Sequence, residues 1–368
     1  MEPSYPLVSV IVPAYNAAAF IGQTLNSVLS QTYAHLEVLV VDDGSQDRTA
    51  DIVRTVAERD RRITLFQQSN RGVAAARNLA IRHAHGDFVA PIDADDFWYP
   101  EKTAKQVRCL TEAGPEVALV YTWSVSIDDQ SPSLSACAHT DLRGSVFRAL
   151  LFRNFVGNAS VPLIRRSCLE QAGGYADFRA TDACGCEDWG LLLRIAENYQ
   201  FTVVPEYLVG YRAVPGSMSS HTRSMARSYE MIMADVKARH PEIPAQLYRW
   251  SRSNFYLYLA GVSYGTAEYR YALHLIVRIL WLDKATWLSP WVFWVLGMSL
   301  MSASLQPMTS WMDPQVSLRK RLRRFLRGQR CPVPSLAGLQ ENVRRPPTRQ
   351  RLFNRVMDRR WAQVTANP

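Results

Sequence analysis

The residues of this sequence that are best suited to chemistry are three groups of carboxylates. They are Asp42-Asp43, Asp93-Ala94-Asp95-Asp96 and Glu187-Asp188. Two carboxylates one residue apart at a strand end can reach a common point, and Mg²⁺ is usually held by one or two carboxylates together with substrate phosphates. The group at residues 93–96 is therefore typical of a site for a divalent metal ion and a diphosphate.

The segments around these groups predict where they lie. Short apolar runs at residues 8–12, 37–41, 63–66, 88–92 and 117–121 alternate with helical patterns at 17–30, 49–59, 72–83 and 101–113. Such alternation predicts βαβ units and a mostly parallel central sheet with helices on both faces. Ligands of these sheets bind beyond the carboxyl ends of the strands. Polar or acidic residues follow three predicted strands, at 13–16, 42–45 and 93–96, so we expect a ligand site at this edge.

The carboxylate pair after the second predicted strand suits a nucleoside. A carboxylate there can accept a hydrogen bond from a base N–H or from a ribose hydroxyl, and Gly44 permits a turn with positive φ. A structural role is also open, because Ser45 or Asp47 can cap the helix that follows.

Composition argues against several other classes of protein. The 368 residues are 48% apolar and 20% charged, which permits a sizeable core and excludes global disorder. Six scattered cysteines without a CxxC pair do not indicate a disulfide scaffold or a zinc site. The net charge of +9 belongs to the end of the chain, because residues 315–368 hold 14 Lys and Arg against 2 Asp and Glu, whereas residues 1–314 hold 28 against 31. A nucleic-acid-binding core is therefore not expected.

The last third of the chain predicts contact with a membrane. Residues 285–312 contain no charged residue, five of the ten tryptophans lie in or beside this stretch, and a basic run begins at Arg319. An apolar segment beside a cationic one suits an anionic cytoplasmic leaflet. One spanning helix and a re-entrant or interfacial helix pair both fit the pattern; the alternative is a buried helical hairpin followed by a solvated basic helix.

The order of five segments resembles the family 2 glycosyltransferases of the GT-A fold. These segments are VSVIVPAYN, LNSVLSQTY, EVLVVDDGSQDRT, NRGVAAARN and GDFVAPIDADDFWYP, and the resemblance covers about Val8–Ser219. It implies a nucleotide-diphospho-sugar donor, with UDP as the default nucleotide, a divalent cofactor such as Mn²⁺ or Mg²⁺, and transfer with inversion at the sugar carbon.

The resemblance also implies roles on the donor side. Pro13, Ala14 and Tyr15 match the loop that packs on the nucleoside, where Tyr15 can stack on the base. Asp43 matches the residue that reads the base, and Arg77 matches a basic residue near the nucleotide.

The metal and diphosphate are expected at the fourth strand end. Asp93, Ala94 and Asp95 match the DxD motif, in which one carboxylate usually meets the ribose and the other the metal ion. Asp96 leaves this register open by one position. His221 is a candidate third metal ligand, although a lone histidine is more often structural.

On the acceptor side, Glu187-Asp188-Trp189 resembles the ED motif of the family. Inverting transfer needs a base that takes the proton of the attacking hydroxyl, so we expect Asp188 to be this base and Glu187 to assist or to bind the acceptor. The alternative is a plain helix-capping pair. Trp189 can line the acceptor site or pack in the core, and Arg212 can neutralise the diphosphate leaving group.

These inferences predict three regions. Residues 1–222 form a GT-A domain with a donor half (1–125) and an acceptor half (126–222), residues 223–314 form a helical, membrane-associated region, and residues 315–368 form a basic, partly disordered tail. The acceptor is expected to be a glycan or a lipid-linked saccharide. Since no secretory signal begins the sequence, we expect a cytoplasmic protein at the inner face of the cell membrane.

Two other functions share parts of this pattern. A nucleotidyltransferase-like user of nucleotide-sugars typically carries a Gly-rich basic loop after its first strand, where this chain has Pro13-Ala14-Tyr15-Asn16. A non-catalytic membrane-associated protein of the same fold is disfavoured because all the expected catalytic carboxylates are intact.

Overall fold

The computed structural model of the chain describes residues 5–128, 131–136, 140–212, 214, 217–309 and 348–366. These residues form two compact units. The α/β unit runs to Arg239 and the helical unit from His240 to Gln363, with the segment 130–132 assigned to the helical unit and the chain end from Val364 to the α/β unit. The basic run that begins at Arg319 lies outside the described residues.

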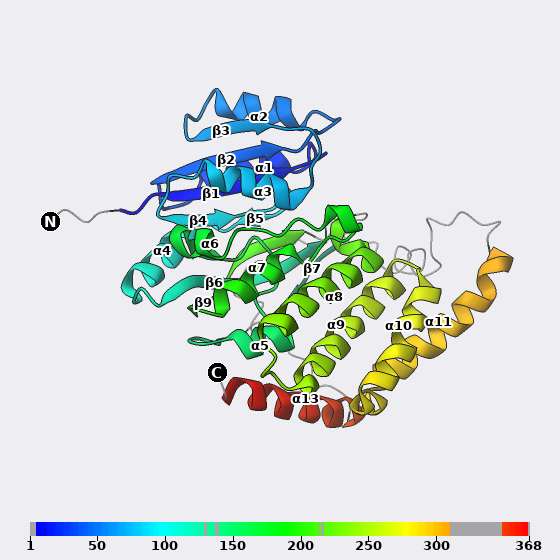
Figure 1. Ribbon diagram of the computed structural model, residues 1–368. Coiled ribbons are helices and arrows are strands. Elements are labelled where there is room, and N and C mark those ends of the chain that lie inside the picture. Colours follow the sequence, from blue (N-terminus) through cyan, green and yellow to red (C-terminus); the bar gives the residue numbers. More distant parts are fainter. Residues whose placement is uncertain are drawn as a thin grey trace. The chain divides into compact units, whose positions relative to one another are not determined.

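Nine strands of the described residues form one mixed sheet, with the order β3-β2-β1-β4-β8-β6-β9-β5 and with β7 paired to β6 (Figure 1). The strands span Val8–Ala14 (β1), Leu36–Asp42 (β2), Ile63–Gln67 (β3), Phe88–Pro91 (β4), Phe97–Trp98 (β5), Val117–Asp128 (β6), Ser131–Ala136 (β7), Leu163–Arg165 (β8) and Gln200–Arg212 (β9). The first four strands are mutually parallel, whereas β8 is antiparallel to both β4 and β6.

The helices of the α/β unit connect and cover these strands. They span Ile21–Leu29 (α1), Thr49–Ala57 (α2), Val73–Arg82 (α3), Lys102–Glu112 (α4), Phe147–Phe152 (α5), Arg166–Gln171 (α6), Glu187–Ala196 (α7) and Thr222–Arg239 (α8), with short 3₁₀ turns at Arg179–Thr181 (η1) and Met218–Ser220 (η2). In the sheet, β2 lies beside β1 and β3 lies beside β2, whereas β4 lies on the opposite side of β1. Because βαβ crossovers are right-handed, α1 and α2 cover one face and α3 the other. The predicted α/β fold is confirmed.

The parallel strands bring the expected ligand residues to one edge. β1 and β4 are buried along their whole length, as strands covered on both faces must be. Ala14 pairs with Asp42 in register, and β4 ends at Pro91, two residues before Asp93. The carboxyl ends of β1, β2 and β4 therefore point the same way. Asp47 accepts a hydrogen bond from the Thr49 N–H (2.9 Å) at the start of α2, which is one of the two capping options that the sequence left open.

β9 corrects one sequence expectation. The segment at residues 201–212 predicted two strands broken at Pro205, but β9 is one continuous strand parallel to β6. The register shifts where Thr122 pairs with Val204 and Trp123 with Tyr207, so Pro205 falls in a bulge where no ladder N–H is required.

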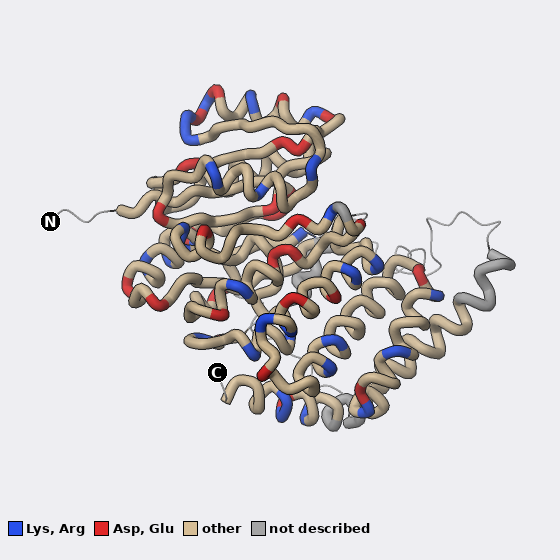
Figure 2. The backbone as a smooth tube through the Cα atoms, viewed as in Figure 1, with Lys and Arg blue, Asp and Glu red and all other residues tan. Residues whose placement is uncertain are grey.

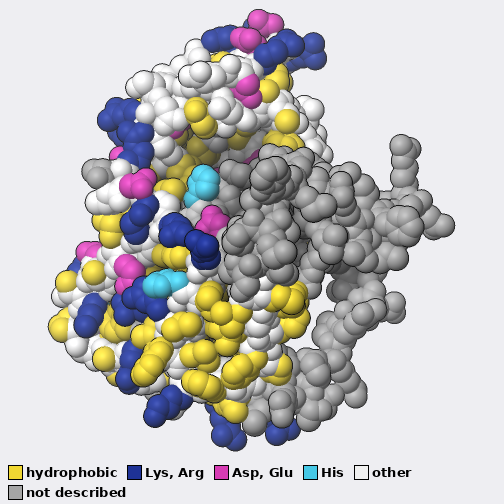
Figure 3. All heavy atoms as spheres, turned by 90° about the vertical axis from the view of Figure 1, so that its right-hand side faces the viewer, with side chains coloured by type: hydrophobic (Ala, Val, Ile, Leu, Met, Phe, Trp, Pro, Cys, Tyr) yellow, Lys and Arg dark blue, Asp and Glu magenta, His cyan; other side chains and the backbone are white. Residues whose placement is uncertain are grey.

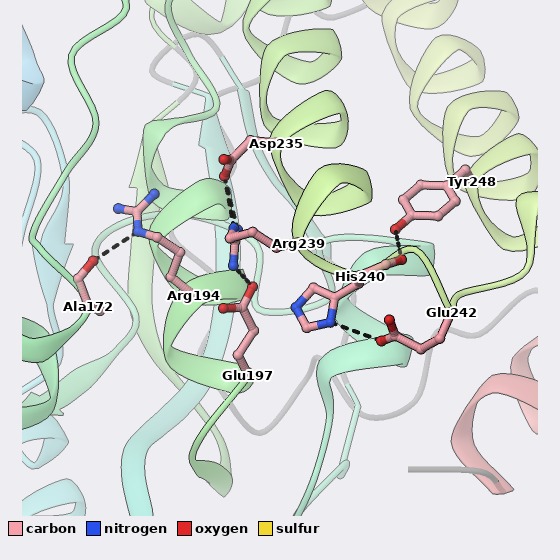
Figure 4. Close-up of polar contacts among 8 residues, drawn as sticks. All are labelled: Ala172, Arg194, Glu197, Asp235, Arg239, His240, Glu242 and Tyr248. Carbon is pink, nitrogen blue, oxygen red and sulfur yellow. Dashed lines mark hydrogen bonds and ion pairs between the residues drawn. The ribbon is translucent and has the colours of Figure 1, made fainter.

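Helix α8 belongs to the α/β unit because it packs on α7. The rings of Trp189 and Tyr229 lie 5.4 Å apart, and the Arg239 guanidinium binds Glu197 at the end of α7 and Asp235 one turn back (2.9 Å; Figure 4). The sequence-based boundary at residue 222 had assigned this helix to the helical region. In the helical unit, the turn after α8 has its own contacts, a His240–Glu242 pair (3.1 Å) and a Tyr248 hydroxyl that donates to the His240 carbonyl (3.4 Å; Figure 4).

The helical unit contains α9 (Ala245–Gly265), α10 (Tyr269–Leu282), the 3₁₀ turn η3 (Lys284–Leu288), α11 (Pro290–Thr309) and α13 (Thr348–Ala366). A C-terminal helical extension was predicted and is confirmed, although a helix at the chain end was not anticipated. Within the described ranges, none of the helices combines the length and the apolar character needed to cross a bilayer.

A buried ion pair fixes α13 within the helical unit. The Arg360 guanidinium makes two contacts with the Asp283 carboxylate, at 2.5 and 2.8 Å, and lies 4.7 Å from the centre of the Trp250 ring. Burial alone would raise the pKa of Asp283, but the hydrogen bonds and charge of Arg360 outweigh this effect and lower it. Asp283 lies between α10 and η3, so one contact joins three elements.

Removing the cation should therefore destabilise the helical unit. We expect Arg360→Met to lower the free energy of unfolding by about 3–5 kcal/mol, because a buried carboxylate loses its partner. Arg359→Met, which removes an exposed charge from the neighbouring position of the same helix, should change it by less than about 0.5 kcal/mol. Urea unfolding followed by circular dichroism measures both values; equal stability of the two variants would contradict the structural role of the pair.

Candidate active site

Of the three carboxylates in the loop after β4, two are partly exposed and one is buried. Asp96 is buried, and its carboxylate accepts hydrogen bonds from the Ser160 hydroxyl (2.5 Å) and from the Arg212 backbone N–H (2.9 Å). Asp93 and Asp95 keep partial exposure. The sequence left open which two of the three carboxylates are available to a ligand. Asp93 and Asp95 are the available ones, and Asp96 holds the loop.

Two hydroxyl residues that sequence reasoning missed fix this loop. The Thr24 hydroxyl lies 2.8 Å from the Ala94 carbonyl and 2.7 Å from the Asp96 carbonyl, and the Ser160 hydroxyl also accepts from the Asp93 N–H (3.0 Å). Both residues are buried. No sequence signal distinguishes them, because Ser and Thr are common and these contacts span more than 60 residues.

The loop is electrostatically suited to a cation. Burial, and then repulsion by Asp93, raises the pKa of Asp95 to about 6, against a weaker opposing effect of Arg212. A divalent ion between Asp93 and Asp95 would remove this repulsion, and two carboxylates with a diphosphate suffice to hold Mg²⁺. The residues present therefore fit Mn²⁺ or Mg²⁺.

His221 is not brought to this loop as a third ligand. In the part of the chain that the structure describes, no three His, Cys, Asp or Glu side chains gather as a metal-binding group. His221 is exposed and follows η2, at the end of a segment in which residues 213, 215 and 216 lie outside the described ranges. The expected set of Asp93, Asp95 and His221 is thus not assembled.

Arg77 links the donor and acceptor sides of the site. It is buried on α3, its guanidinium pairs with Asp93 at 2.5 Å, and it lies 5.0 Å from the centre of the Tyr175 ring. Its charge also lowers the pKa of Asp188. The Arg77 Nε has no hydrogen-bond partner among the described residues, so a ligand oxygen could satisfy it. Sequence reasoning placed Arg77 near the nucleotide, but missed that it connects two carboxylates.

The neighbouring Asn78 positions Tyr175. The side chain of Asn78 donates to the Tyr175 carbonyl (2.7 Å) and accepts from its N–H (2.9 Å). Burial raises the pKa of Tyr175 to about 12, so its ring is a neutral support for the guanidinium.

Asp188 is a partly buried carboxylate at the start of α7, next to the buried Glu187. Burial is the largest effect on its pKa and, despite the opposing charge of Arg77, raises it to about 6. Glu187 accepts from the Gly185 N–H (2.9 Å), which shapes the preceding loop. Cys186 takes the N-cap position without a side-chain hydrogen bond, and the Asp188 carboxylate accepts from the Trp189 N–H (2.7 Å) in the first turn of the helix. Trp189 is buried, with its indole N–H donating to the Leu150 carbonyl (2.9 Å), and therefore packs in the core.

The residues expected on the nucleoside side lie at the ends of β1 and β2. Pro13 and Ala14 are buried in β1, whereas Tyr15 is 50% exposed just beyond it, as a stacking residue must be. The Asp43 carboxylate accepts from the Gln68 side chain and from the N–H groups of Arg71 and Gly72, each at 2.7 Å. Asp43 thus holds the loop before α3, a role that sequence reasoning did not anticipate.

Arg212 lies under the loop at residues 93–96. Its Nε donates to the Asp95 carbonyl (2.8 Å), its guanidinium donates to the Gln23 side chain (2.6 Å), and it lies 4.9 Å from the centre of the Phe20 ring. The Arg212 side chain therefore supports the loop, and its positive charge acts on a ligand only from this place beneath the loop.

A pocket of about 300 Å³ opens between the start of α3 and the start of α7. It is lined by Gly72, Val73, Ala74, Asp177, Phe178, Arg179, Asp182, Ala183, Cys184, Glu187, Met218 and Ser224. Gly72 is required at its edge, because its φ is +84° and a Cβ there would lie 2.7 Å from Arg179 Cδ. This volume is at the lower end of the range for small-molecule sites.

Known proteins share this sequence and this fold. The profile of the family described as glycosyl transferase family 2 matches residues 9–161. TuaG of Bacillus subtilis strain 168, a glycosyltransferase named for teichuronic acid biosynthesis, is 32% identical over 237 residues, which are 64% of this chain and 90% of TuaG. Other curated relatives match over shorter stretches, 43% and 40% of their own lengths in two cases.

Two solved structures share the fold. The mannosyltransferase PcManGT of Pyrobaculum calidifontis, in complex with GDP-Man and Mn²⁺, is 24% identical with a TM-score of 0.54 over 83% of this chain and 88% of that one. S. aureus TarS 1–349, in complex with UDP-GlcNAc, is 17% identical with a TM-score of 0.57 over 83% and 91% of the two chains.

The loop-holding contacts of Asp43 generate a prediction. We expect Asp43→Ala to lower the free energy of unfolding by about 3 kcal/mol, because the N–H groups of Arg71 and Gly72 lose a charged acceptor. Asp51→Ala, which removes an exposed carboxylate from α2, should change it by less than about 0.5 kcal/mol. Thermal unfolding, with nucleotide affinity measured in parallel, separates the two roles of Asp43: an unchanged stability with lost affinity would leave it only a nucleotide contact.

Proposed function

The chain belongs to glycosyltransferase family 2, and from that premise we propose that it transfers a sugar from a nucleotide-diphospho-sugar to a hydroxyl of a glycan or lipid-linked saccharide. The donor is a UDP-sugar by default, and the sugar carbon is inverted. The single observation that carries the proposal is the charged cluster of Arg77, Asp93, Asp95 and Asp188, which joins a metal-compatible loop to a partly buried carboxylate.

Asp188 is the general base of this proposal. An effective base has a pKa near the working pH, and burial raises the pKa of Asp188 to about 6. Arg77 keeps the pKa from rising further, so the carboxylate is largely ionised at neutral pH. Glu187 keeps the loop before Asp188 in place through Gly185 and borders the pocket, where it can bind the acceptor.

Asp93 and Asp95 would hold the metal ion, whose positive charge would stabilise the diphosphate leaving group. Arg212 supports this site from below by fixing the backbone of Asp95. The unsatisfied Arg77 Nε is available to an oxygen of the donor. Tyr15 stacks on the base, and Pro13, Ala14, Asp43 and Ala94 form the walls of the nucleotide site.

The acceptor enters beside Glu187. The pocket at the start of α7 contains the Phe178 ring, the Arg179 cation and exposed acidic groups, a mixture that suits a saccharide with several hydroxyl groups. The likeness to TuaG, which is named for the biosynthesis of teichuronic acid, also favours a glycan acceptor. A cytoplasmic site at the inner face of the membrane would give access to nucleotide-sugars and to lipid-linked saccharides alike.

The role of Asp188 can be tested by its charge and by pH. We expect Asp188→Asn to reduce turnover by roughly 10²-fold or more, with donor affinity within a few-fold of the wild type, because the shape remains and the basicity is lost. For the wild type, turnover should fall tenfold per pH unit below about pH 6, since protonated Asp188 cannot accept a proton. Steady-state kinetics between pH 4.5 and 8 and nucleotide-sugar titration measure both quantities.

The exposed Glu170 on α6 provides a control, and Glu170→Gln should leave turnover and its pH profile unchanged. Equal losses of turnover and donor affinity in Asp188→Asn would make Asp188 a structural residue. A flat profile through pH 6 would also remove it as the base.

The metal site has a separate test. We expect EDTA to abolish transfer and Asp95→Ala to abolish both transfer and Mn²⁺ binding in the presence of UDP, because one carboxylate and the balancing charge at the diphosphate are lost. Electron paramagnetic resonance of Mn²⁺ gives a binding measurement that is independent of turnover. Activity that persists in EDTA would require cationic side chains, rather than a metal ion, at the leaving group.

A further inference from the structure

The helical unit exposes an apolar surface that its core does not use. We define the tryptophan face as Val277, Trp281, Trp287, Leu288, Phe293 and Met301, which lie on α10, η3 and α11. Trp281 is 86% exposed and Trp287 is 56% exposed. Figure 3 shows apolar side chains gathered in the lower part of the view, at the level where α10, η3 and α11 meet in Figure 1. Soluble surfaces rarely gather large side chains in this way without a binding role.

The tryptophan face is continuous and has a defined inner side. Trp287 bridges the two helices, because its indole N–H donates to the Leu280 carbonyl (3.1 Å) and its ring lies 6.0 Å from that of Phe293. Val277 and Trp281 are one turn apart on α10, while Ile276 and Ile279 of the same helix are buried. The core is thus already filled by the other sides of these helices.

The charge of the helical unit identifies the partner that suits this face. Residues 240–363 contain 19 Lys and Arg against 6 Asp and Glu, whereas residues 1–239 contain 23 against 27. Figure 2 shows the described part of this contrast along α9, α10 and α13. Close to the face, Arg278 and Lys284 are exposed, and the one acidic neighbour, Asp283, is buried and paired with Arg360.

We infer that the tryptophan face docks on an anionic lipid bilayer and lies in its headgroup region. Indole rings favour the membrane–water interface, and each cation near an anionic surface adds about 1 kcal/mol of attraction. The same surface is poorly suited to self-association, because two copies of a unit with this excess of cations repel each other. The docking does not depend on the proposed transfer reaction, since it uses no residue of the α/β unit.

Vesicle sedimentation of the full chain tests this inference. The protein should pellet with vesicles of phosphatidylcholine and phosphatidylglycerol in a 7:3 ratio, and much less with phosphatidylcholine alone. We expect Trp281→Ala/Trp287→Ala to lower the partition coefficient on anionic vesicles at least tenfold, and Lys284→Gln, which removes one positive charge, to lower it by about fivefold. Tyr5→Ala, which removes an exposed aromatic ring from the α/β unit, should leave it unchanged.

Nucleotide binding, measured on every variant, shows that the fold is retained and separates this test from that of the proposed function. If the double variant binds anionic vesicles as strongly as the wild type does, the inference is overturned. A wild-type protein that binds neither kind of vesicle would also overturn the inference. Sedimentation velocity gives a third decisive outcome: a dimer that the double variant abolishes would make the face a self-association surface.

Discussion

The ion pair between Arg77 and Asp93 is the interaction on which the site depends. It joins α3 to the loop after β4, at a separation of 2.5 Å, with the guanidinium buried and the carboxylate partly exposed. Burial by itself would lower the pKa of Arg77, but Asp93, Tyr175 and Asp188 outweigh that effect and raise it, so the guanidinium stays charged. A cation held in this way fixes the charge state of its neighbours, and Asp188 is among them.

The sheet topology explains why these groups meet. Successive parallel strands deliver Asp43 and Asp93 to one edge, while α3 turns back across β1 and carries Arg77 towards it. The antiparallel strand β8 then extends the sheet towards the acceptor half, where Ser160 contacts the loop and α7 brings Asp188. In the proposed reaction, the donor and acceptor halves would share one set of charges, and the binding of a nucleotide-sugar would be linked to the ionisation of the proposed base.

Local sequence patterns predicted the elements well because each depends on short-range rules. The apolar run before Pro13 and the spacing of Ile21, Leu25 and Val28 determine a strand and a helix almost by themselves. The motifs likewise indicated Asp93, Asp95 and Asp188 by residue type and position, and the roles of these three residues stay predictions.

What escaped prediction depends on contacts distant in the sequence. Ser160 meets Asp96 across 64 residues, and Asn78 meets Tyr175 across 97, so no local pattern could reveal either contact. For the same reason the sequence could not show that Asp43 holds a loop or that Arg212 lies beneath one. Pro205 misled the reading of β9, because a bulge in the pairing with β6 relieves the constraint that proline imposes.

The state of Asp188 can be measured directly by titrating its side-chain carboxyl carbon in ¹³C-labelled protein by NMR, with Asp188→Asn to assign the resonance. A partly buried Asp188 with the pKa that burial and Arg77 together give it should titrate with a midpoint near pH 6. A midpoint near 4, the ordinary value of an exposed aspartate, would contradict the conclusion that the fold prepares this residue as a base.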